Sequence, residues 1–496
     1  MTAQTGLRRD PIAWLLFALV WFSCGWFGSW EFNPNNATRM YAAVSLVEQG
    51  DATIDEYAAL TIDRAQFGDH FYTDKAPGMT LMAVPFVALA DAVTGDDAEF
   101  HRIRNEDPGF NRFIKIRVRL TAVFTSALFV AIAAMMLFDL GRGVTGSPAA
   151  GLFGALGYAL GSIAWGWATT IFGHAASGAM LVIAVWAVWR GTRTPGGTRA
   201  SIGYAAIAGL ALGWGAVIEP PSVLEALPIG LWALWRMRGW AWAQRLPVML
   251  AAAGVALVAV LPLFAYNAFA FGSPFQSGYA GVTDFAGMQQ GFFGLTYPKP
   301  HVLWEIVFGP RRGILWVSPV LVLAPIGLAW LLWDRRHRDL AVLAIVLSIL
   351  PFLYNAAYYY WDGGHSTGPR HAVPALGFLG LGLAGFWTLL RTAVGKLLAA
   401  QLLAISMAIN LMIASAEIAA PDFFDYAVWR AVLLERFAPG YLRTVADEWL
   451  GFTPWEGLGI WALVALPLLG VVAWLAWRAD GGSTAQHRAP SPVRAE

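Results

Sequence analysis

The sequence predicts an all-α protein that crosses a membrane many times. Of its 496 residues, 57% are hydrophobic and only 13% are charged, and the chain holds 25 tryptophans. A soluble domain has no interior large enough for so much apolar surface, whereas a bundle of membrane helices presents it to lipid. The apolar residues fall into successive runs long enough to span a bilayer, and arginine-rich stretches separate alternate runs.

Composition also excludes several classes of function. The net charge of +1 argues against a nucleic-acid partner, which needs a basic face. The single cysteine, Cys24, lies in the first apolar run, so neither a disulfide framework nor a cysteine metal site is expected. No glycine-rich nucleotide loop and no G-x-S-x-G elbow occurs, which leaves ATP-driven transport and serine hydrolysis without support.

The first span is predicted at Pro11–Trp30. Arg8 and Arg9 precede it, and no small-residue cleavage site follows it, so it is interpreted as an uncleaved span with a cytoplasmic N-terminus. Glu31 then emerges on the outer face.

The next apolar stretch, Lys75–Val93, is short and broken by Pro77 and Pro85. If it crossed the membrane, the later basic loops would lie outside, against the positive-inside rule. We therefore expect it to lie on the outer surface or to re-enter. The further spans are then expected at 118–140, 149–166, 174–190, 202–218, 222–235, 246–268, 313–332, 339–357, 372–390, 397–415 and 457–477, which makes about twelve in all.

In this topology the short inner loops are basic and both ends of the chain are cytoplasmic. Residues 1–478 form a single transmembrane domain, with outer loops at 31–117, 269–312 and 416–456. The tail at 479–496 is rich in Gly, Ser, Pro and Ala and is predicted to be disordered. Because the inner loops hold little except arginine, the chemistry is expected on the outer face.

Within the first outer loop, Ala37–Glu48 has an amphipathic pattern. Met40 and Tyr41 fall on its apolar side, and Arg39 and Glu48 are expected to be exposed. The pattern predicts a helix that lies in the membrane surface.

Lys75 stands where this polar loop meets an apolar segment, and it is the only lysine before Lys115. A lone cation at such a border can extend toward water with its stem in lipid. The other interpretation is that Lys75 binds an anion, such as the phosphate of a lipid-linked substrate.

The stretch Tyr358–His371, YYYWDGGHSTGPRH, is the second candidate. Arg370 begins an apolar run as Lys75 does, and an arginine fork with a lysine can clamp one phosphate. Asp362 and His365 are predicted to contact substrate with them, because a solvated loop has no use for so rigid a glycine–proline frame. The aromatic residues either stack on a sugar or form an interfacial belt. Asp362, His365 and His371 match no strong metal motif, so no metal ligand and no cofactor is predicted.

The chain resembles the GT-C class of polytopic glycosyltransferases, which includes protein O-mannosyltransferases and bacterial lipid A aminoarabinose transferases. A short first span opens onto a long outer loop that carries TRMYAAVSLVEQGD and then FYTDKAPG. The phrases YNAFAFGSPFQSGY, GPRRGILWVSPVLVL and WDGGHSTGPRHAVPAL are similar to those of uncharacterised bacterial members. The topology corresponds over roughly the first two-thirds of the chain, and the motif match is local.

The resemblance implies a transferase that takes sugar from a polyprenyl-phosphate donor, with Lys75 at the position that contacts the donor phosphate. It also implies an acidic base early in the first loop, but this chain has the amides Asn35 and Asn36 there, and an amide takes no proton from a hydroxyl. Glu31 is the first substitute, Asp55 of the Asp55–Glu56 pair the second and Asp74 the third. Asn36 and Arg39, in the same stretch, are predicted to contact substrate.

The predicted function is therefore transfer of a sugar from a polyprenyl-phosphate donor to a glycan, lipid or protein acceptor on the outer face. The composition, rich in tryptophan and in arginine over lysine, suggests a bacterial inner membrane with the site facing the periplasm. The alternative is a transporter or flippase of lipid-linked sugars, which would show paired halves and mid-membrane charges. A transferase should bring Glu31, Lys75 and Arg370 to one cavity.

Overall fold

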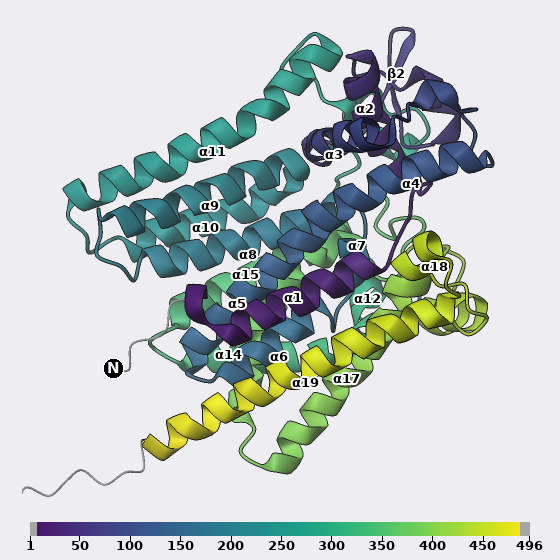
Figure 1. Ribbon diagram of the computed structural model, residues 1–496. Coiled ribbons are helices and arrows are strands. Elements are labelled where there is room, and N and C mark those ends of the chain that lie inside the picture. Colours follow the sequence, from purple (N-terminus) through teal and green to yellow (C-terminus); the bar gives the residue numbers. More distant parts are fainter. Residues whose placement is uncertain (1–6, 487–496) are drawn as a thin grey trace, which may run out of the picture.

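The computed structural model describes residues 7–486 and shows a bundle of long helices that lie side by side (Figure 1). Several helices begin with proline directly after an Asp, Asn or Ser whose side chain accepts a backbone N–H, as Asp10 does before Pro11 and Ser147 before Pro148. The bundle helices are α1 (Pro11–Trp26), α4 (Pro108–Ala122), α5 (Leu128–Thr145), α6 (Pro148–Ala159), α8 (Gly173–Gly191), α9 (Arg199–Ile218), α10 (Val223–Arg236), α11 (Trp242–Phe271), α14 (Ala324–Trp333), α15 (Arg338–Ala357), α16 (Leu376–Leu389), α17 (Ala393–Ala416) and α19 (Pro454–Gln486).

Among the described residues, 7 helices are long and apolar enough to cross a membrane. One of them joins α4 and α5 into a continuous helix, Pro108–Thr145, through a π turn at Val123–Ala127. The predicted all-α polytopic class is confirmed, and helix occupies every predicted span. The run at 149–166 is divided between α6 and α7 (Ala164–Ala168), and that at 313–332 between α13 (Ile314–Val317) and α14. The number of membrane spans, about twelve, stays a prediction.

Small residues let the inner helices approach closely. A Cβ added at Gly154 of α6 would lie 2.4 Å from the carbonyl of Gly380 in α16, and one at Gly327 of α14 would lie 1.8 Å from that of Gly382. Glycine at these positions brings the two backbones into contact, which is how membrane helices associate without a hydrophobic driving force. This packing fixes α16, and with it the loop that precedes α16.

The first outer loop folds into a small layer at one end of the bundle, at the upper right of Figure 1. It contains α2 (Pro34–Val44), a π turn at Ser45–Gln49, a hairpin of β1 (Ala65–Phe67) and β2 (His70–Tyr72), and α3 (Gly78–Thr94). Helix α3 packs on α2, α4 and α9. The later outer segments add α12 (Pro300–Val307) and α18 (Val445–Leu450).

Several sequence predictions are corrected by the fold. The helix expected to lie in the membrane surface, α2, is buried on all sides from Asn35 to Val44, and Glu48, expected to be exposed, is half-buried. Arg39, expected on the exposed side of its helix, is 1% exposed, because its guanidinium contacts Glu219 and the side chain of Asn35. Helix α19 extends to Gln486, beyond the predicted start of a disordered tail at residue 479. The rest of that tail, from residue 487, lies outside the described residues.

Candidate substrate site

Lys75 is held between two carboxylates. Its Nζ lies 2.8 Å from Asp74 Oδ2 and 3.3 Å from Asp63 Oδ2, and its side chain is only 15% exposed. The hairpin explains this pairing: Ala65 is opposite Tyr72, so the same antiparallel register continues to place residue 63 opposite residue 74. Lys75 is therefore a fixed cation inside the protein rather than one that extends into solvent.

Asp63, Asp74 and Lys75 form a triad in which opposite charges stabilise the ionised forms. Burial lowers the pKa of the Lys75 ammonium, but Asp63 and Asp74 outweigh that effect and the net shift is upward, so the amine stays protonated. Burial raises the pKa of the Asp74 carboxyl, and Lys75 opposes that rise. Within residues 7–486, the second oxygen of Asp74, Oδ1, has no hydrogen-bond partner although it is buried.

Gly78 joins this hairpin to the end of α9. A Cβ at position 78 would lie 2.5 Å from the backbone nitrogen of Ile218, so only glycine lets the start of α3 meet the last turn of α9. Glu219 follows that turn directly. The glycine of the KAPG stretch therefore brings Lys75 and Glu219 to the same part of the molecule.

Glu219 is a buried carboxylate with several partners. Its Oε1 lies 3.2 Å from the guanidinium of Arg39 and 3.8 Å from Nδ1 of His174, and Gly173 donates its backbone N–H. That last contact is at the N-terminus of α8, where the helix dipole favours an anion. Burial raises the pKa of the Glu219 carboxyl, and the charges of Arg39, Lys75 and Arg370 oppose the rise. Arg39 is thus the cation in contact with this acid, and Lys75 and Arg370 act on it at longer range.

Arg370 reaches this place from the loop before α16. Gly363, Gly364 and Gly368 of that loop have φ values of +70°, +60° and +89°, which L side chains rarely adopt. A Cβ at Gly363 would lie 2.9 Å from Nε of Arg370, so the loop needs glycine there to wrap the arginine. Burial raises the pKa of the Tyr358 hydroxyl, and Lys75 and Arg370 oppose the rise, which places both cations within electrostatic reach of one phenol.

The residues Arg39, Asp63, Asp74, Lys75, Glu219 and Arg370 are called the Lys75 cluster below. It holds three cations and three carboxylates. Arg39 and Lys75 each form a salt bridge within it. Arg370 is half-buried and lies over the ring of Phe172 at 5.3 Å, but within the described part of the chain its guanidinium has no salt bridge or hydrogen bond. It is the cation of the cluster that is available to an added anion.

Other predicted substrate residues have structural partners. Asn36 donates its amide to the carbonyl of Trp30 at 3.0 Å and accepts the N–H of Ile171 at 3.1 Å, so it joins α2 to the segment before α8. Asp362 accepts the N–H of Gly364 inside its own loop, and His365 is exposed on that loop.

The predicted bases do not all reach the Lys75 cluster. Asp55 accepts the N–H of Phe71 and contacts His70, both at 2.6 Å, and so supports the outer side of the hairpin. Glu31 lies in a different group, 3.6 Å from Lys115 and 3.8 Å from Arg443. Burial raises its pKa and these two cations oppose the rise. Of the three predicted acids, Asp74 is the one in the cluster.

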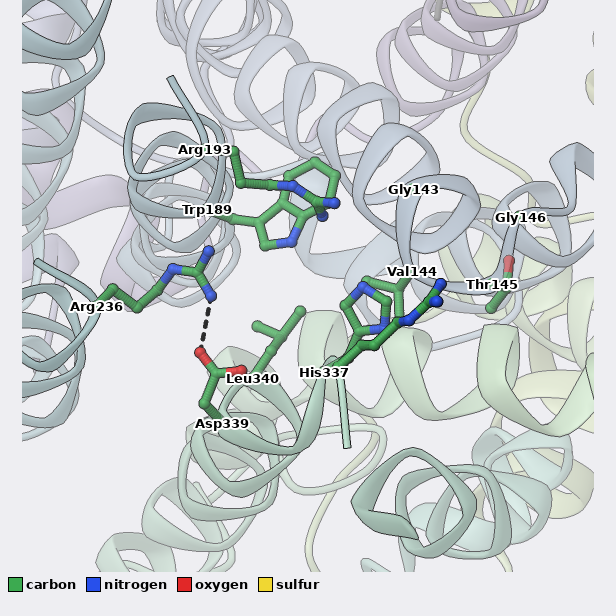
Figure 2. Close-up of a pocket in the computed structure, with 11 residues that line it drawn as sticks. Gly143, Val144, Thr145, Gly146, Trp189, Arg193, Arg236, His337, Asp339 and Leu340 are labelled. Carbon is green, nitrogen blue, oxygen red and sulfur yellow. Dashed lines mark hydrogen bonds and ion pairs between the residues drawn. The ribbon is translucent and has the colours of Figure 1, made fainter. Parts of the chain in front are cut away.

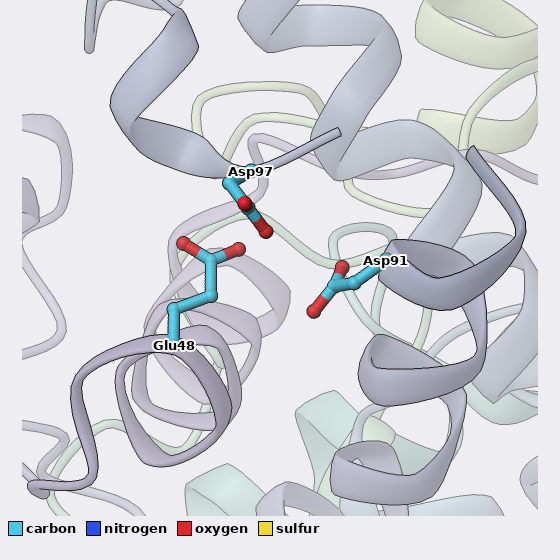
Figure 3. Close-up of side chains that lie close together, drawn as sticks. All are labelled: Glu48, Asp91 and Asp97. Atoms are coloured by element: carbon cyan, nitrogen blue, oxygen red, sulfur yellow. The ribbon is translucent and has the colours of Figure 1, made fainter. Parts of the chain in front are cut away.

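A group of three carboxylates, Glu48, Asp91 and Asp97, lies elsewhere in the first outer loop (Figure 3). One oxygen of each falls within 4.8 Å of the others. Arg117 donates to Asp91, and the N–H of Ala98 donates to Glu48, so protein groups already serve two of the three. This group lines a separate cavity of about 380 Å³.

Sequence reasoning missed Asp63 and gave Glu219 no role. Asp63 could have been found from the short hairpin, whose pairing places it opposite Asp74. Glu219 carried a weaker signal, an acid between the end of a predicted span and a Pro–Pro pair. Its neighbours come from α2 and α8, far away in the sequence.

No protein-family model and no curated protein matches the chain. The chain is similar to the structure of ArnT from Cupriavidus metallidurans bound to undecaprenyl phosphate, with 14% identity and a TM-score of 0.47, over 96% of this chain and 78% of that one. It is also similar to the archaeal oligosaccharyltransferase AglB from Archaeoglobus fulgidus, in complex with an inhibitory peptide and a dolichol-phosphate (12%, TM-score 0.45, 84% and 57% covered). A third likeness is to the S. cerevisiae protein O-mannosyltransferase Pmt1-Pmt2 complex bound to the sugar donor (14%, TM-score 0.38, 60% and 38% covered). With identities and TM-scores this low, these likenesses assign no role to any residue.

Proposed function

We propose that the protein is a glycosyltransferase that moves a sugar from a polyprenyl-phosphate donor to an acceptor at the outer face of a bacterial inner membrane. The proposal rests on Arg370, a half-buried arginine that has no salt bridge in residues 7–486. Its charge, like that of Lys75, acts on both Glu219 and Tyr358. Keeping a half-buried cation without a partner has a desolvation cost, which a bound anion offsets. The resemblance of the sequence to GT-C enzymes supplies the identity of that anion, a lipid phosphate.

In this proposal the donor phosphate lies between Arg370 and Lys75. The guanidinium offers a planar fork that holds two phosphate oxygens, and the Lys75 ammonium adds a point charge. Both stabilise the negative charge that grows on the phosphate as the anomeric C–O bond breaks. Preorganised contacts of this kind typically lower the activation barrier by about 3–4 kcal/mol each. Because the phosphate leaves ionised, it needs no proton from a general acid.

We assign the base to Glu219 in place of Glu31. Attack with inversion requires the base and the leaving phosphate on opposite faces of the sugar. Asp63 and Asp74 both touch the Lys75 ammonium and therefore lie on the phosphate side. Glu219 is bound by Arg39 instead, and feels Lys75 and Arg370 only at longer range. Its pKa, raised by burial, favours uptake of a proton from an acceptor hydroxyl.

The test is release of sugar from a panel of radiolabelled polyprenyl-phosphate sugars by the purified full-length protein. Arg370→Gln and Glu219→Gln are expected to abolish release. Arg102→Gln, which changes an exposed arginine of the outer loop, is the matched control and should keep it. Glu31→Gln should also keep it, because Glu31 lies in another group. Movement of labelled lipid across the bilayer with no release from any donor would favour the flippase alternative and refute the proposal.

A further inference from the structure

A second polar cavity lies at the opposite end of the bundle from the Lys75 cluster. Helix α8 begins beside the cluster at His174 and reaches the cavity at Trp189, about 22 Å further along its axis at 1.5 Å per residue. Helix α15 runs the other way, from Asp339 at the cavity to Tyr354, whose ring lies 6.5 Å from that of His371, the neighbour of Arg370. The two sites therefore face opposite sides of the membrane that the spanning helices imply.

The cavity has a volume of about 570 Å³, within the range of small-molecule sites. Figure 2 shows Arg193 and Trp189 on one side, Arg236 and Asp339 on another, and His337 across from them. These residues come from the ends of α8 and α10 and from the start of α15. The full lining is Gly143, Val144, Thr145, Gly146, Trp189, Arg193, Arg236, Arg336, His337, Asp339 and Leu340.

The charge of this lining is positive. It contains three arginines and a histidine against one acid, Asp339, which already binds Arg236 at 2.8 Å. His337 is bound to Asp334 at 2.7 Å. Arg193 and Arg336 have no salt bridge among residues 7–486. Partial burial lowers the pKa of Arg193, the like charges of Arg236 and Arg190 lower it further, and Asp339 opposes them without reversing the net downward shift.

Other arginines at this end of the bundle are different. Arg142 and Arg190 both bind the buried carboxylate of Asp139, which satisfies their charges inside the protein. A glycine also shapes the floor of the cavity. A Cβ at Gly143 would lie 2.3 Å from the Trp189 ring, so that ring can lie under Arg193 only with glycine at position 143. Arg193 stacks on Trp189 at 4.6 Å, which fixes the direction of its guanidinium.

We propose that this cavity binds an anionic phosphate group. Arg193 and Arg336 supply charge-assisted hydrogen bonds, Arg236 holds the rim through Asp339, and Trp189 supports the guanidinium of Arg193. A phospholipid headgroup of the cytoplasmic leaflet and a soluble phosphate ester share this chemistry, and basic pockets between membrane helices on that side bind such headgroups. The proposal does not depend on the transferase activity.

The experiment uses the full-length protein in nanodiscs. Native mass spectrometry counts phosphatidylglycerol adducts as that lipid is titrated into phosphatidylcholine, and calorimetry measures inorganic phosphate and ADP in phosphatidylcholine alone. The cavity variant is Arg193→Gln with Arg336→Gln. The matched control is Arg238→Gln with Arg335→Gln, which do not line the cavity. Arg335 is next to Arg336 in the same loop, and Arg238 lies in the loop after α10, two residues from Arg236. All four are exposed, and each variant removes one cation–π contact, because Arg193 lies over the ring of Trp189 and Arg238 over that of Trp235.

We expect the cavity variant to lose about tenfold or more in affinity for one of the probes, and the control to bind as wild type. A loss for phosphatidylglycerol identifies a lipid headgroup site, and a loss for phosphate or ADP identifies a soluble phosphate ester. Equal binding by the two variants, or no binding in either arm, would overturn the proposal.

Discussion

Replacing Lys75 by methionine should destabilise the protein as well as stop transfer. The amine contacts Asp74 at 2.8 Å and Asp63 at 3.3 Å, and these carboxylates are 3% and 11% exposed. Without the lysine, two nearly buried acids face each other with no cation in contact. Removing one partner of a buried ion pair typically costs about 3–5 kcal/mol, so we expect a loss in that range.

Thermal unfolding in detergent, followed by size-exclusion chromatography, measures this loss. Lys75→Met with Asp74→Asn should recover most of the stability, because one of the two uncompensated charges is gone. The double variant should still release no sugar, since the phosphate contact is missing. The loss should shrink at low pH, where a proton neutralises one acid. Wild-type stability in the single variant, or transfer restored in the double variant, would refute the triad as described.

Three further predictions concern separate contacts. Asn36→Asp, which installs the acid that the family pattern has, should destabilise the protein by about 1–3 kcal/mol in thermal unfolding and restore no base, because the amide donates to a buried carbonyl. Burial raises the pKa of Glu48 to about 7 from 4.5, so its contribution to stability should fall as pH rises between these values. Glu48→Gln should flatten that profile, and an unchanged pH dependence of unfolding would contradict the assignment. Gly173→Ala should displace the Glu219 carboxylate, because the new Cβ would lie 2.2 Å from Oε1, and should lower the transfer rate. Gly203→Ala, in open space, is its control and should have no effect.

The sequence was sufficient for the fold class and for four of the six members of the Lys75 cluster, namely Lys75, Arg370, Asp74 and Arg39. Hydropathy and the charge of short loops are local properties of the sequence. The spans predicted from them all coincide with helix in the structure. Lys75 and Arg370 were also visible locally, as cations at the start of apolar runs with glycine and proline beside them. The three glycines that precede Arg370 have positive φ, as a rigid loop requires.

The partners of these cations could not be read in the same way. Arg39 was expected to be exposed because it lies on the polar side of its helix, but its partner Glu219 is 180 residues away. The helical period gives the direction of a side chain and leaves open which distant segment covers it. Asn36 was compared with a catalytic acid, whereas its position needs both a donor and an acceptor, which an amide has and a carboxylate lacks.

The affinity of Arg370→Gln for a short-chain polyprenyl phosphate tests the central claim most directly. In residues 7–486 this arginine has no salt bridge, so its removal leaves no acid without a partner and the fold should be kept. We expect the variant to unfold as wild type does and to bind the lipid about 10–100-fold more weakly, as the loss of one charge-assisted contact implies. Wild-type affinity in a folded Arg370→Gln protein would contradict the placement of the donor phosphate between Arg370 and Lys75.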